Sequence, residues 1–333
     1  MNWKNKKVAI TGADGFIGSH LTETLVGLSA NVTALAQYNS FDTNGWLDDL
    51  SVEALKAIRI IRGDVRDPGQ MMSFCNGQDV VFHLAALISI PFSYDAPSSY
   101  IQTNVQGTAN VLQGALQSGV SRVIHTSTSE VYGTAQFTPI TEDHPLQGQS
   151  PYSASKIGAD MIAESFYRSF ELPVATLRPF NTYGPRQSER AVLSTIIRQI
   201  LDERCETVRL GDLSTKRDFN FVADTVRAFI KLAEADSQYL GQSFNAGSGQ
   251  TIEINEALRI IVELTGTDKP IVQDKDRIRP KNSEVLVLMA DSSELNQAAD
   301  WSPKVDLRAG LNETIDWWRN RLNAVRTDAS FIY

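Results

Sequence analysis

Short apolar runs alternate with amphipathic segments through the first half of the chain. The runs predict buried strands at residues 6–11, 32–35, 58–62, 80–84, 122–126 and 174–177. A strand that is covered on both faces is apolar throughout, and parallel strands need a long connection, usually a helix, between them. The alternation is therefore typical of an α/β protein with a doubly wound parallel sheet.

The pattern becomes less regular after about residue 179. We expect a short strand at residues 207–210 and helices at 188–201 and 255–265. A final helix at 311–322 carries Trp317 and Trp318, which we expect to serve packing. Since no internal repeat, low-complexity tract or long linker separates the two parts, we predict a smaller second region packed against the sheet, with a cleft between them.

Composition is that of a globular enzyme. The 333 residues suffice for a large core, and 42% are apolar while 21% are charged. The 31 basic residues are outnumbered by 39 acidic ones, so the net charge is −8. This balance argues against a nucleic-acid partner.

Two further features bear on location and on metals. The first residues are charged and lead directly into a strand, and the most apolar stretch, residues 80–92, is too short to span a membrane. We therefore expect a cytoplasmic protein with no membrane partner. Cys75 and Cys205 are the only cysteines, and because they lack close spacing and a histidine cluster, we expect no metal site. A reducing compartment would also disfavour a disulfide between them.

A glycine-rich turn follows the first predicted strand. Gly12, Gly15 and Gly18 stand between that strand and a helical pattern at residues 19–28. Gly12 allows a tight turn, Gly15 lets a diphosphate approach the helix N-terminus, and Gly18 allows the helix to pack closely. Strand, glycine turn and helix in this order predict a dinucleotide-binding site.

A second motif indicates redox chemistry. Tyr152 stands four residues before Lys156, and if Pro151 opens a helix, both side chains lie on one face, one turn apart. A lysine cation within reach favours a phenolate, which can take a proton from a hydroxyl. Tyr and Lys at this spacing also occur by chance on many helices. The glycine turn at the start of the chain is independent support for the catalytic interpretation.

Together the motifs resemble those of the extended short-chain dehydrogenase/reductases, specifically the NAD-dependent epimerase/dehydratase group that acts on nucleotide sugars. The resemblance covers nearly the whole chain. It rests on the order and spacing of the glycine turn, Gly63-Asp-Val65, His83-Leu-Ala-Ala86, Asn104-Val-Gln-Gly107, Ser127-Thr-Ser-Glu-Val-Tyr-Gly133, Tyr152 and Lys156, Arg178-Pro-Phe-Asn-Thr-Tyr-Gly-Pro185, Arg217-Asp-Phe219 and Arg279-Pro280.

The resemblance implies a Rossmann-type NAD(P)-binding domain over residues 1–180, to which a segment at about 218–245 returns. Residues 181–333 would form most of a substrate-binding region. The cofactor, NAD+ or NADP+, would be tightly bound and would contact Gly12, Gly15, Phe16, Ile17, Gly18, Asp64, Val65, Leu84, Ala85, Ala86, Tyr152 and Lys156. Helices around residues 102–117 and 152–169 would form a homodimer, as in relatives.

The same resemblance implies a set of substrate contacts. Thr128 would hydrogen-bond the 4-hydroxyl of the sugar. Asn181, Arg217 and Arg279 would bind the nucleotide diphosphate, a role that suits amide and guanidinium donors, and Arg186 would also contact the substrate. For each arginine the plainer alternative is a surface ion pair. Asn104 would be structural and hold the helix beside the catalytic residues.

Glu130 divides the possible reactions. A 4-epimerase removes and returns a hydride at C4 and needs no further base, whereas a 4,6-dehydratase needs a carboxylate to take the C5 proton. We expect Glu130, two residues beyond Thr128 on a strand, to share its face and point into the same cleft. Thr128, Ser129 and Glu130 together resemble the GDP-mannose dehydratase pattern; dTDP-glucose dehydratases have Asp where Ser129 stands. Glu130 could then serve as base and, once protonated, as acid.

Several alternatives stay open. The Ser-Glu pair also occurs in UDP-glucuronate decarboxylases and in some epimerases, and a catalytically inactive nucleotide-sugar-binding regulator on the same fold is a hypothesis of another class. Loop residues 38–47 and 186–192 resemble dehydratases of legionaminic acid pathways, which act on nucleotide-linked N-acetylglucosamine. The sequence does not distinguish UDP from GDP as the nucleotide of the substrate. It also does not distinguish NAD from NADP, because Ala36 and Gln37 stand where an acid usually ends the second strand.

Overall fold

The computed structural model describes residues 1–274 and 287–322. A seven-stranded parallel sheet forms its centre, with the strand order β11-β6-β5-β4-β1-β2-β3. The strands are β1 Lys7–Thr11, β2 Asn31–Gln37, β3 Ile58–Gly63, β4 Val80–His83, β5 Arg122–Thr126, β6 Val174–Pro179 and β11 Ser243–Ala246. The predicted α/β fold with a Rossmann-type doubly wound sheet is confirmed.

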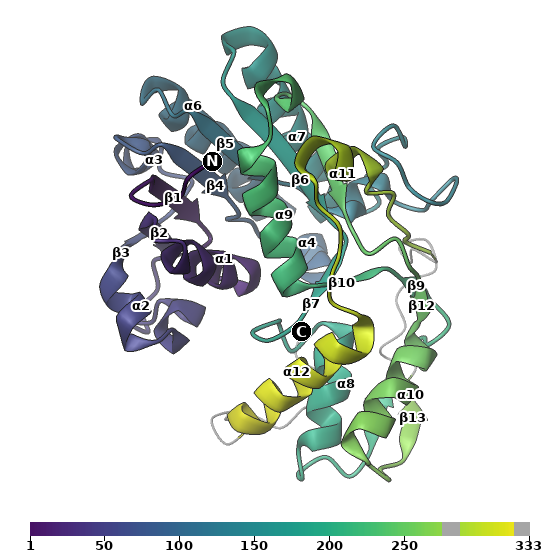
Figure 1. Cartoon of the computed structure of the whole chain (residues 1–333). Helices are drawn as coiled ribbons and strands as arrows, with labels where there is room; N and C mark the ends of the chain where they lie inside the picture. The colour runs from purple at the N-terminus through teal and green to yellow at the C-terminus, as the bar shows by residue number, and fades with distance from the viewer. Residues whose placement is uncertain (275–286, 323–333) are drawn as a thin grey trace.

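Alternate side chains of the strands enter two different cores. Val8 and Ile10 of β1 belong to a core that α1 (Phe16–Gly27) and α9 (Val222–Glu234) cover. Ala9 belongs to a core with residues of α3 (Pro68–Cys75) and α6 (Gly107–Gln117), and α7 (Pro151–Phe170) covers that same face (Figure 1). The sheet is therefore buried on both sides, which explains why its strands are apolar throughout.

The last strand of the sheet comes from late in the chain. After β6 the chain leaves the sheet, builds part of the smaller region, and returns through α9 to β11, whose Phe244 pairs with Leu177 of β6. Helix α9 also contacts α1, β5 and β6. Segments separated by about 60 residues of sequence are thus neighbours in the sheet.

The smaller region consists of helices and two-stranded sheets below the main sheet (Figure 1). Its helices are α8 Val192–Leu201, α10 Ile254–Thr265 and α12 Leu307–Arg321, close to the predicted ranges. Its strands pair as β7 Asn181–Tyr183 with β10 Phe219–Phe221, β9 Lys216–Arg217 with β12 Ile252–Glu253, and β8 Val208–Leu210 with β13 Ile271–Gln273. Helix α11, Ser293–Ala299, packs against α9 and β11.

Shorter elements complete the described chain. These are η1 Gly45–Asp49, α2 Val52–Ala57, α4 Ile90–Asp95, α5 Pro97–Tyr100, the π-helical turn η2 Ile101–Gln106, η3 Ser129–Tyr132 and η4 Ser237–Tyr239. Cys75 is buried in the core and Cys205 is partly buried, and both are free thiols. Within residues 1–274 and 287–322, no helix has the length and apolar character of a membrane span, and no cluster of potential metal ligands occurs.

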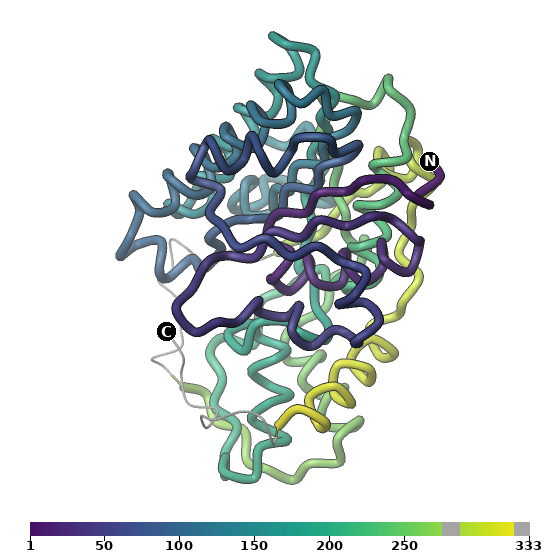
Figure 2. The backbone as a smooth tube through the Cα atoms, turned by 90° about the vertical axis from the view of Figure 1, so that its left-hand side faces the viewer, coloured from purple at the N-terminus to yellow at the C-terminus, as the bar shows by residue number. Residues whose placement is uncertain are grey.

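The C-terminal helix contacts the segment that follows β2. Trp317 of α12 lies 5.6 Å from Trp46 of η1 between ring centres, and the guanidinium of Arg321 lies 4.5 Å from the centre of the Trp46 ring. Arg321 also pairs with Asp49. Figure 2 shows α12 beside the early part of the chain. Trp318 is buried in the core, so the tryptophan pair serves packing, as expected.

Candidate functional site

The glycine turn lies at the carboxyl end of β1. Gly12 has a φ of +67°, and a Cβ there would meet the backbone nitrogen of Ala85 at 2.7 Å. A Cβ at Gly18 would lie 2.0 Å from the carbonyl oxygen of Gly12. Gly15 is the N-cap of α1 and brings no side-chain cap, which leaves the N-terminal peptide groups of Phe16 and Ile17 without one. An anion would be favoured at this helix end.

The exit of β4 is fixed against this turn. The hydroxyl of Thr11 accepts hydrogen bonds from the backbone N–H groups of Leu84 and Ala85, each at 3.2 Å, and lies 2.8 Å from Nδ1 of His83. The predicted cofactor residues 84–86 therefore start directly beside Gly12. The structure brings two separate sequence motifs to one edge of the sheet.

Asp64 and Val65 follow the end of β3 at the same edge. The carboxylate of Asp64 accepts hydrogen bonds from Arg66, which is the largest cause of its lowered pKa. Val65 is buried, and its carbonyl oxygen accepts a hydrogen bond from Asn110 at 3.0 Å. Their contact with an adenine stays a prediction.

Tyr152 lies in the first turn of α7. The helix begins with a capping box in which Ser150 and Ser153 exchange hydrogen bonds. The ring of Tyr152 is 7% exposed and meets the buried ring of Tyr100 edge-on, with 6.2 Å between centres. Burial raises the pKa of Tyr152, a hydrogen bond with Thr128 lowers it, and the charge of Glu130 raises it. Burial therefore outweighs the expected shift toward phenolate.

Lys156 lies one turn further along the same helix and is 3% exposed. Its ammonium donates a hydrogen bond of 2.6 Å to the carbonyl oxygen of Thr126, at the end of β5. Burial lowers the pKa of Lys156 to about 8, and the carboxylate of Asp160 opposes that shift. The predicted Tyr-Lys pair thus faces the carboxyl end of β5, where Thr128 also lies.

A buried charge network that was not predicted from the sequence supports this helix. One carboxylate oxygen of Asp160 contacts Nε2 of His125 at 3.2 Å. The other accepts hydrogen bonds from Ser127 at 2.8 Å and from Arg178 at 3.2 and 3.3 Å. Burial raises the pKa of Asp160, but hydrogen bonding to His125 and the surrounding positive charges outweigh this effect and hold the pKa below its usual range. The network joins β5, β6 and α7 beneath the predicted catalytic residues.

Glu130 does not lie on a strand, so that prediction was wrong. β5 ends at Thr126, and residues Ser129–Tyr132 form a 3-10 helical turn, η3, because the Thr128 side chain caps the backbone N–H of Glu130 at 3.2 Å. Glu130 is partly buried, and its charge acts on Tyr152. Ser129 is buried beside it. The turn, rather than strand alternation, brings Thr128 and Glu130 to the same place.

Asn104 joins three segments around the site. It lies in the π-helical turn η2 and donates hydrogen bonds of 2.9 Å to the carbonyl oxygen of Leu87 and to the hydroxyl of Ser155, and it accepts one of 2.8 Å from the N–H of Leu87. These contacts fix the segment after β4 against α7.

The predicted substrate residues lie in different surroundings. Asn181 begins β7, and its buried amide nitrogen has no hydrogen-bond partner among the described residues, so it is available to a ligand. Arg186 instead turns to α1, where it pairs with Glu23 at 2.8 Å. Arg217 lies in β9 and donates to the carbonyl oxygen of Lys216. Arg279 lies outside the described residues. Binding of substrate by these side chains stays a prediction.

A second contact joins α1 to the same loop and leads to a prediction. The Nε2–H of His20 donates a 2.9 Å hydrogen bond to the carbonyl oxygen of Pro185, and burial lowers the pKa of His20 to about 4. Between about pH 6.5 and pH 4 the unfolded chain binds a proton that the folded chain does not, so the free energy of unfolding falls as the pH drops through this window.

His20→Gln keeps an N–H donor but cannot titrate. We expect the loss of stability between pH 7 and pH 5 to shrink by about 1–2 kcal/mol in this variant. Urea unfolding followed by circular dichroism at the two pH values measures it. An unchanged pH dependence would show that His20 titrates normally in the folded protein.

A cavity of about 450 Å³ lies apart from Tyr152, between α7, the start of β11 and α11. Arg178 and Asp160 border it from the charge network, and Glu142 borders it from a loop. Burial raises the pKa of Glu142 to about 7, while its carboxylate accepts a 2.7 Å hydrogen bond from the N–H of Asn245. Because Tyr152 does not line this cavity, it is not the predicted substrate cleft.

Comparison with known proteins places these features in context. The profile of the family described as GDP-mannose 4,6 dehydratase matches residues 9–314. A dTDP-glucose 4,6-dehydratase of Streptomyces griseus is 33% identical over 93% of this chain and 93% of the relative. A UDP-glucose 4-epimerase of Mycolicibacterium smegmatis is 31% identical over 95% of this chain and 99% of the relative.

Solved structures give the same picture. The dTDP-glucose 4,6-dehydratase DesIV from Streptomyces venezuelae, with NAD and TYD bound, superposes with a TM-score of 0.86 at 31% identity. The match covers 96% of this chain and 98% of that one. Dehydratases and an epimerase are therefore similar to this chain to nearly the same degree.

Proposed function

Since the chain belongs to the GDP-mannose 4,6-dehydratase family of NAD-dependent nucleotide-sugar dehydratases and epimerases, we propose that it is a nucleotide-sugar 4,6-dehydratase. The observation that carries this choice is the carboxylate of Glu130, whose charge acts on the phenol of Tyr152. An epimerase needs no such group, because its reaction begins and ends at C4. A dehydratase needs a base close to the oxidised carbon.

The protein groups divide the chemistry between them. In its phenolate form Tyr152 takes the proton of the C4 hydroxyl, and Thr128, its hydrogen-bond neighbour, orients that hydroxyl. Lys156 brings a positive charge into the same buried space. A bound nicotinamide ring supplies the acceptor for the C4 hydride and the donor that later reduces C6. The glycine turn, residues 84–86 and the Tyr-Lys pair suit the binding of such a dinucleotide.

Elimination then depends on Glu130. A ketone at C4 acidifies the C5 proton, which Glu130 removes. The C6 hydroxyl needs a proton to leave as water, and the Ser129 side chain is too weak an acid to supply it. Glu130, protonated by the preceding step, gives the proton to the leaving oxygen. When the hydride returns to C6, a solvent proton is added at C5, so atoms and charges balance without another carboxyl group.

The substrate proposal rests on loop residues 38–47 and 186–192, which resemble those of dehydratases that act on nucleotide-linked N-acetylglucosamine. We propose a nucleotide-linked N-acetylglucosamine, with UDP or GDP, bound by Asn181 and Arg217 through the diphosphate. The unpartnered amide nitrogen of Asn181 supports this role. We further propose that the cofactor stays bound through the cycle, since it returns to its starting state, and that the protein is a homodimer.

A panel of UDP-, GDP- and dTDP-linked glucose and N-acetylglucosamine tests the reaction type. In deuterated water we expect a 4-keto-6-deoxy sugar carrying one deuterium at C5, detected by mass spectrometry and NMR. Interconversion of C4 epimers without a keto product would show an epimerase instead. Loss of carbon dioxide from UDP-glucuronate would show a decarboxylase, and binding without any change would favour an inactive regulator.

A further inference from the structure

The tip of β2 carries no acidic residue of its own, but a carboxylate reaches it from the glycine turn. The side chain of Asp14 accepts a 3.0 Å hydrogen bond from the backbone N–H of Gln37, the last residue of β2. The backbone oxygen of Asp14 accepts a 2.9 Å hydrogen bond from Trp46. Asp14 is therefore fixed at both ends, between the turn that suits a diphosphate and the strand tip that follows it.

The close approach of η1 to Asp14 depends on a glycine. Gly45 has a φ of +59°, and a Cβ at this position would lie 2.6 Å from the backbone oxygen of Asp14. Any other residue would push η1 away from the turn. The backbone of Asp14 is thus held beside η1, and the hydrogen bond from Gln37 holds its side chain at the strand tip.

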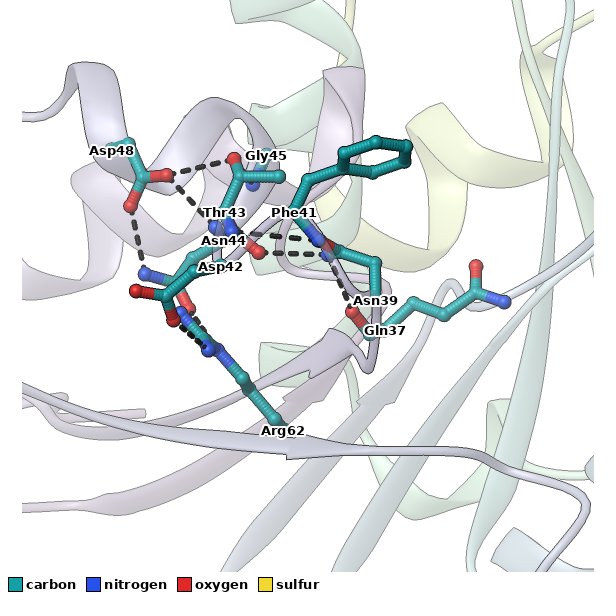
Figure 3. A network of polar contacts seen from close by, with 9 residues as sticks. All are labelled: Gln37, Asn39, Phe41, Asp42, Thr43, Asn44, Gly45, Asp48 and Arg62. Atoms are coloured by element: carbon teal, nitrogen blue, oxygen red, sulfur yellow. Dashed lines mark hydrogen bonds and ion pairs between the residues drawn. The ribbon is translucent and has the colours of Figure 1, made fainter.

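The loop between β2 and η1 is folded by its own polar side chains, as Figure 3 shows. Asn39 donates to the carbonyl oxygens of Gln37 and Thr43 at 3.2 and 2.8 Å and accepts from the N–H of Phe41. Asp48 accepts hydrogen bonds from the Thr43 hydroxyl and from both nitrogens of Asn44. The loop is therefore held in one shape beside the strand tip.

Arginines stand near this place, but each is already paired. Arg62 of β3 lies opposite Ala36 of β2 in the sheet register. Its guanidinium pairs with Asp42 and donates a 2.9 Å hydrogen bond to Asn44 (Figure 3). Arg66, just beyond β3, pairs with Asp64. The sequence alone did not place Arg62 at the strand tip, because the pairing of neighbouring strands decides it.

These contacts bear on the adenosine end of a dinucleotide. In this fold the diphosphate lies at the N-terminus of α1, and the adenosine ribose lies at the tip of β2, where an acid accepts the 2′-hydroxyl of NAD and an arginine binds the 2′-phosphate of NADP. Here the carboxylate of Asp14 lies at the strand tip, and the guanidinium of Arg62 is paired with Asp42. Among residues 1–274 and 287–322, a 2′-phosphate at this tip would therefore meet the negative charge of Asp14 and an arginine that is already neutralised.

We propose that Asp14 takes the role of the missing strand-tip acid and makes the chain select NAD over NADP. This inference rests on the dinucleotide-dependent function proposed above and assigns the cofactor of that same site. The carboxylate would accept the ribose 2′-hydroxyl and repel a 2′-phosphate. Because Arg62 pairs with Asp42, the guanidinium that the β2–β3 register places at the strand tip is already neutralised and would bind a 2′-phosphate only weakly.

Cofactor binding tests the proposal without any nucleotide sugar. The full-length protein is denatured, and the released cofactor is identified by mass spectrometry; we expect NAD(H). A second sample, kept folded and freed of its cofactor, is titrated with NAD+ and with NADP+ by calorimetry. We expect the wild type to bind NAD+ at least about tenfold more tightly than NADP+. Asp14→Asn keeps an oxygen that accepts the hydrogen bond from Gln37, and it should reduce the ratio of the two affinities by roughly tenfold.

Two further variants separate charge from loop structure. Asp48→Asn makes the same change of charge in the loop network, so it should weaken both cofactors and leave their ratio near that of the wild type. Arg62→Ala should not lower NADP+ affinity selectively, because Asp42 already neutralises this side chain. Release of NADP(H) from the wild type, an unchanged ratio in Asp14→Asn, or a selective loss of NADP+ binding in Arg62→Ala would each overturn the proposal. If the protein selects NAD+ but forms no keto sugar, the proposed dehydratase function is refuted and the role of Asp14 stands.

Discussion

Tyr152→Phe is expected to abolish oxidation of the sugar at C4 while the fold and nucleotide-sugar binding are retained. The phenol oxygen is the group next to Thr128 that can take the hydroxyl proton, and loss of a general base typically costs roughly 10²–10⁴-fold in rate. The phenylalanine ring keeps the edge-on contact with Tyr100. Single-turnover absorbance of the reduced nicotinamide at 340 nm, together with the yield of keto product, measures the effect.

Tyr100→Phe is a matched control for this substitution. Tyr100 is buried against Tyr152, but its hydroxyl donates to the carbonyl oxygen of Ser89 instead. Its removal should cost less than tenfold in rate. A Tyr152→Phe protein that oxidises substrate within tenfold of the wild type would exclude Tyr152 as the base.

Glu130→Gln is expected to separate oxidation from elimination. The amide cannot take a proton from C5, so elimination should slow by roughly 10²–10⁴-fold. Oxidation at C4 should continue, because Tyr152, Thr128 and Lys156 are intact. In deuterated water the reduced nicotinamide should therefore accumulate without deuterium entering C5. Mass spectrometry of recovered sugar and absorbance at 340 nm give the two readings.

Glu142→Gln is the control for removing a partly buried carboxylate elsewhere. Glu142 borders the separate cavity between α7, β11 and α11, and burial raises its pKa to about 7. Deuterium exchange at C5 should continue in this variant. Full exchange at C5 in Glu130→Gln would refute the base assignment, and the elimination would then need another group.

Much of the fold could be predicted from the sequence because local patterns determine it. The strands that are buried on both faces are apolar throughout, and the three glycines stand where the backbone allows no Cβ. The helix that carries Tyr152 and Lys156 begins at Pro151, where its first residues can be recognised from proline and flanking serines. These features depend on neighbours in the sequence, so a single sequence contains them.

The site was predictable only in part because its remaining features depend on tertiary structure. Glu130 was predicted to lie on a strand, whereas Thr128 caps a 3-10 turn, η3, that contains Glu130. Asp14 meets the tip of β2 across 23 residues of sequence. The bond between Asp160 and Arg178 likewise joins a helix to a strand. No periodicity or spacing encodes such contacts, and they appear only when the sheet is assembled.

The late return of the chain to β11 has a consequence for biosynthesis. When a ribosome has released only the first 180 residues, β6 is an edge strand whose backbone groups have no partner on one side. Residues 243–246 must emerge before that edge is covered. An isolated fragment of residues 1–180 should therefore aggregate in a way that the full chain does not, and during translation the exposed β6 edge would be the place where a chaperone gives the most protection.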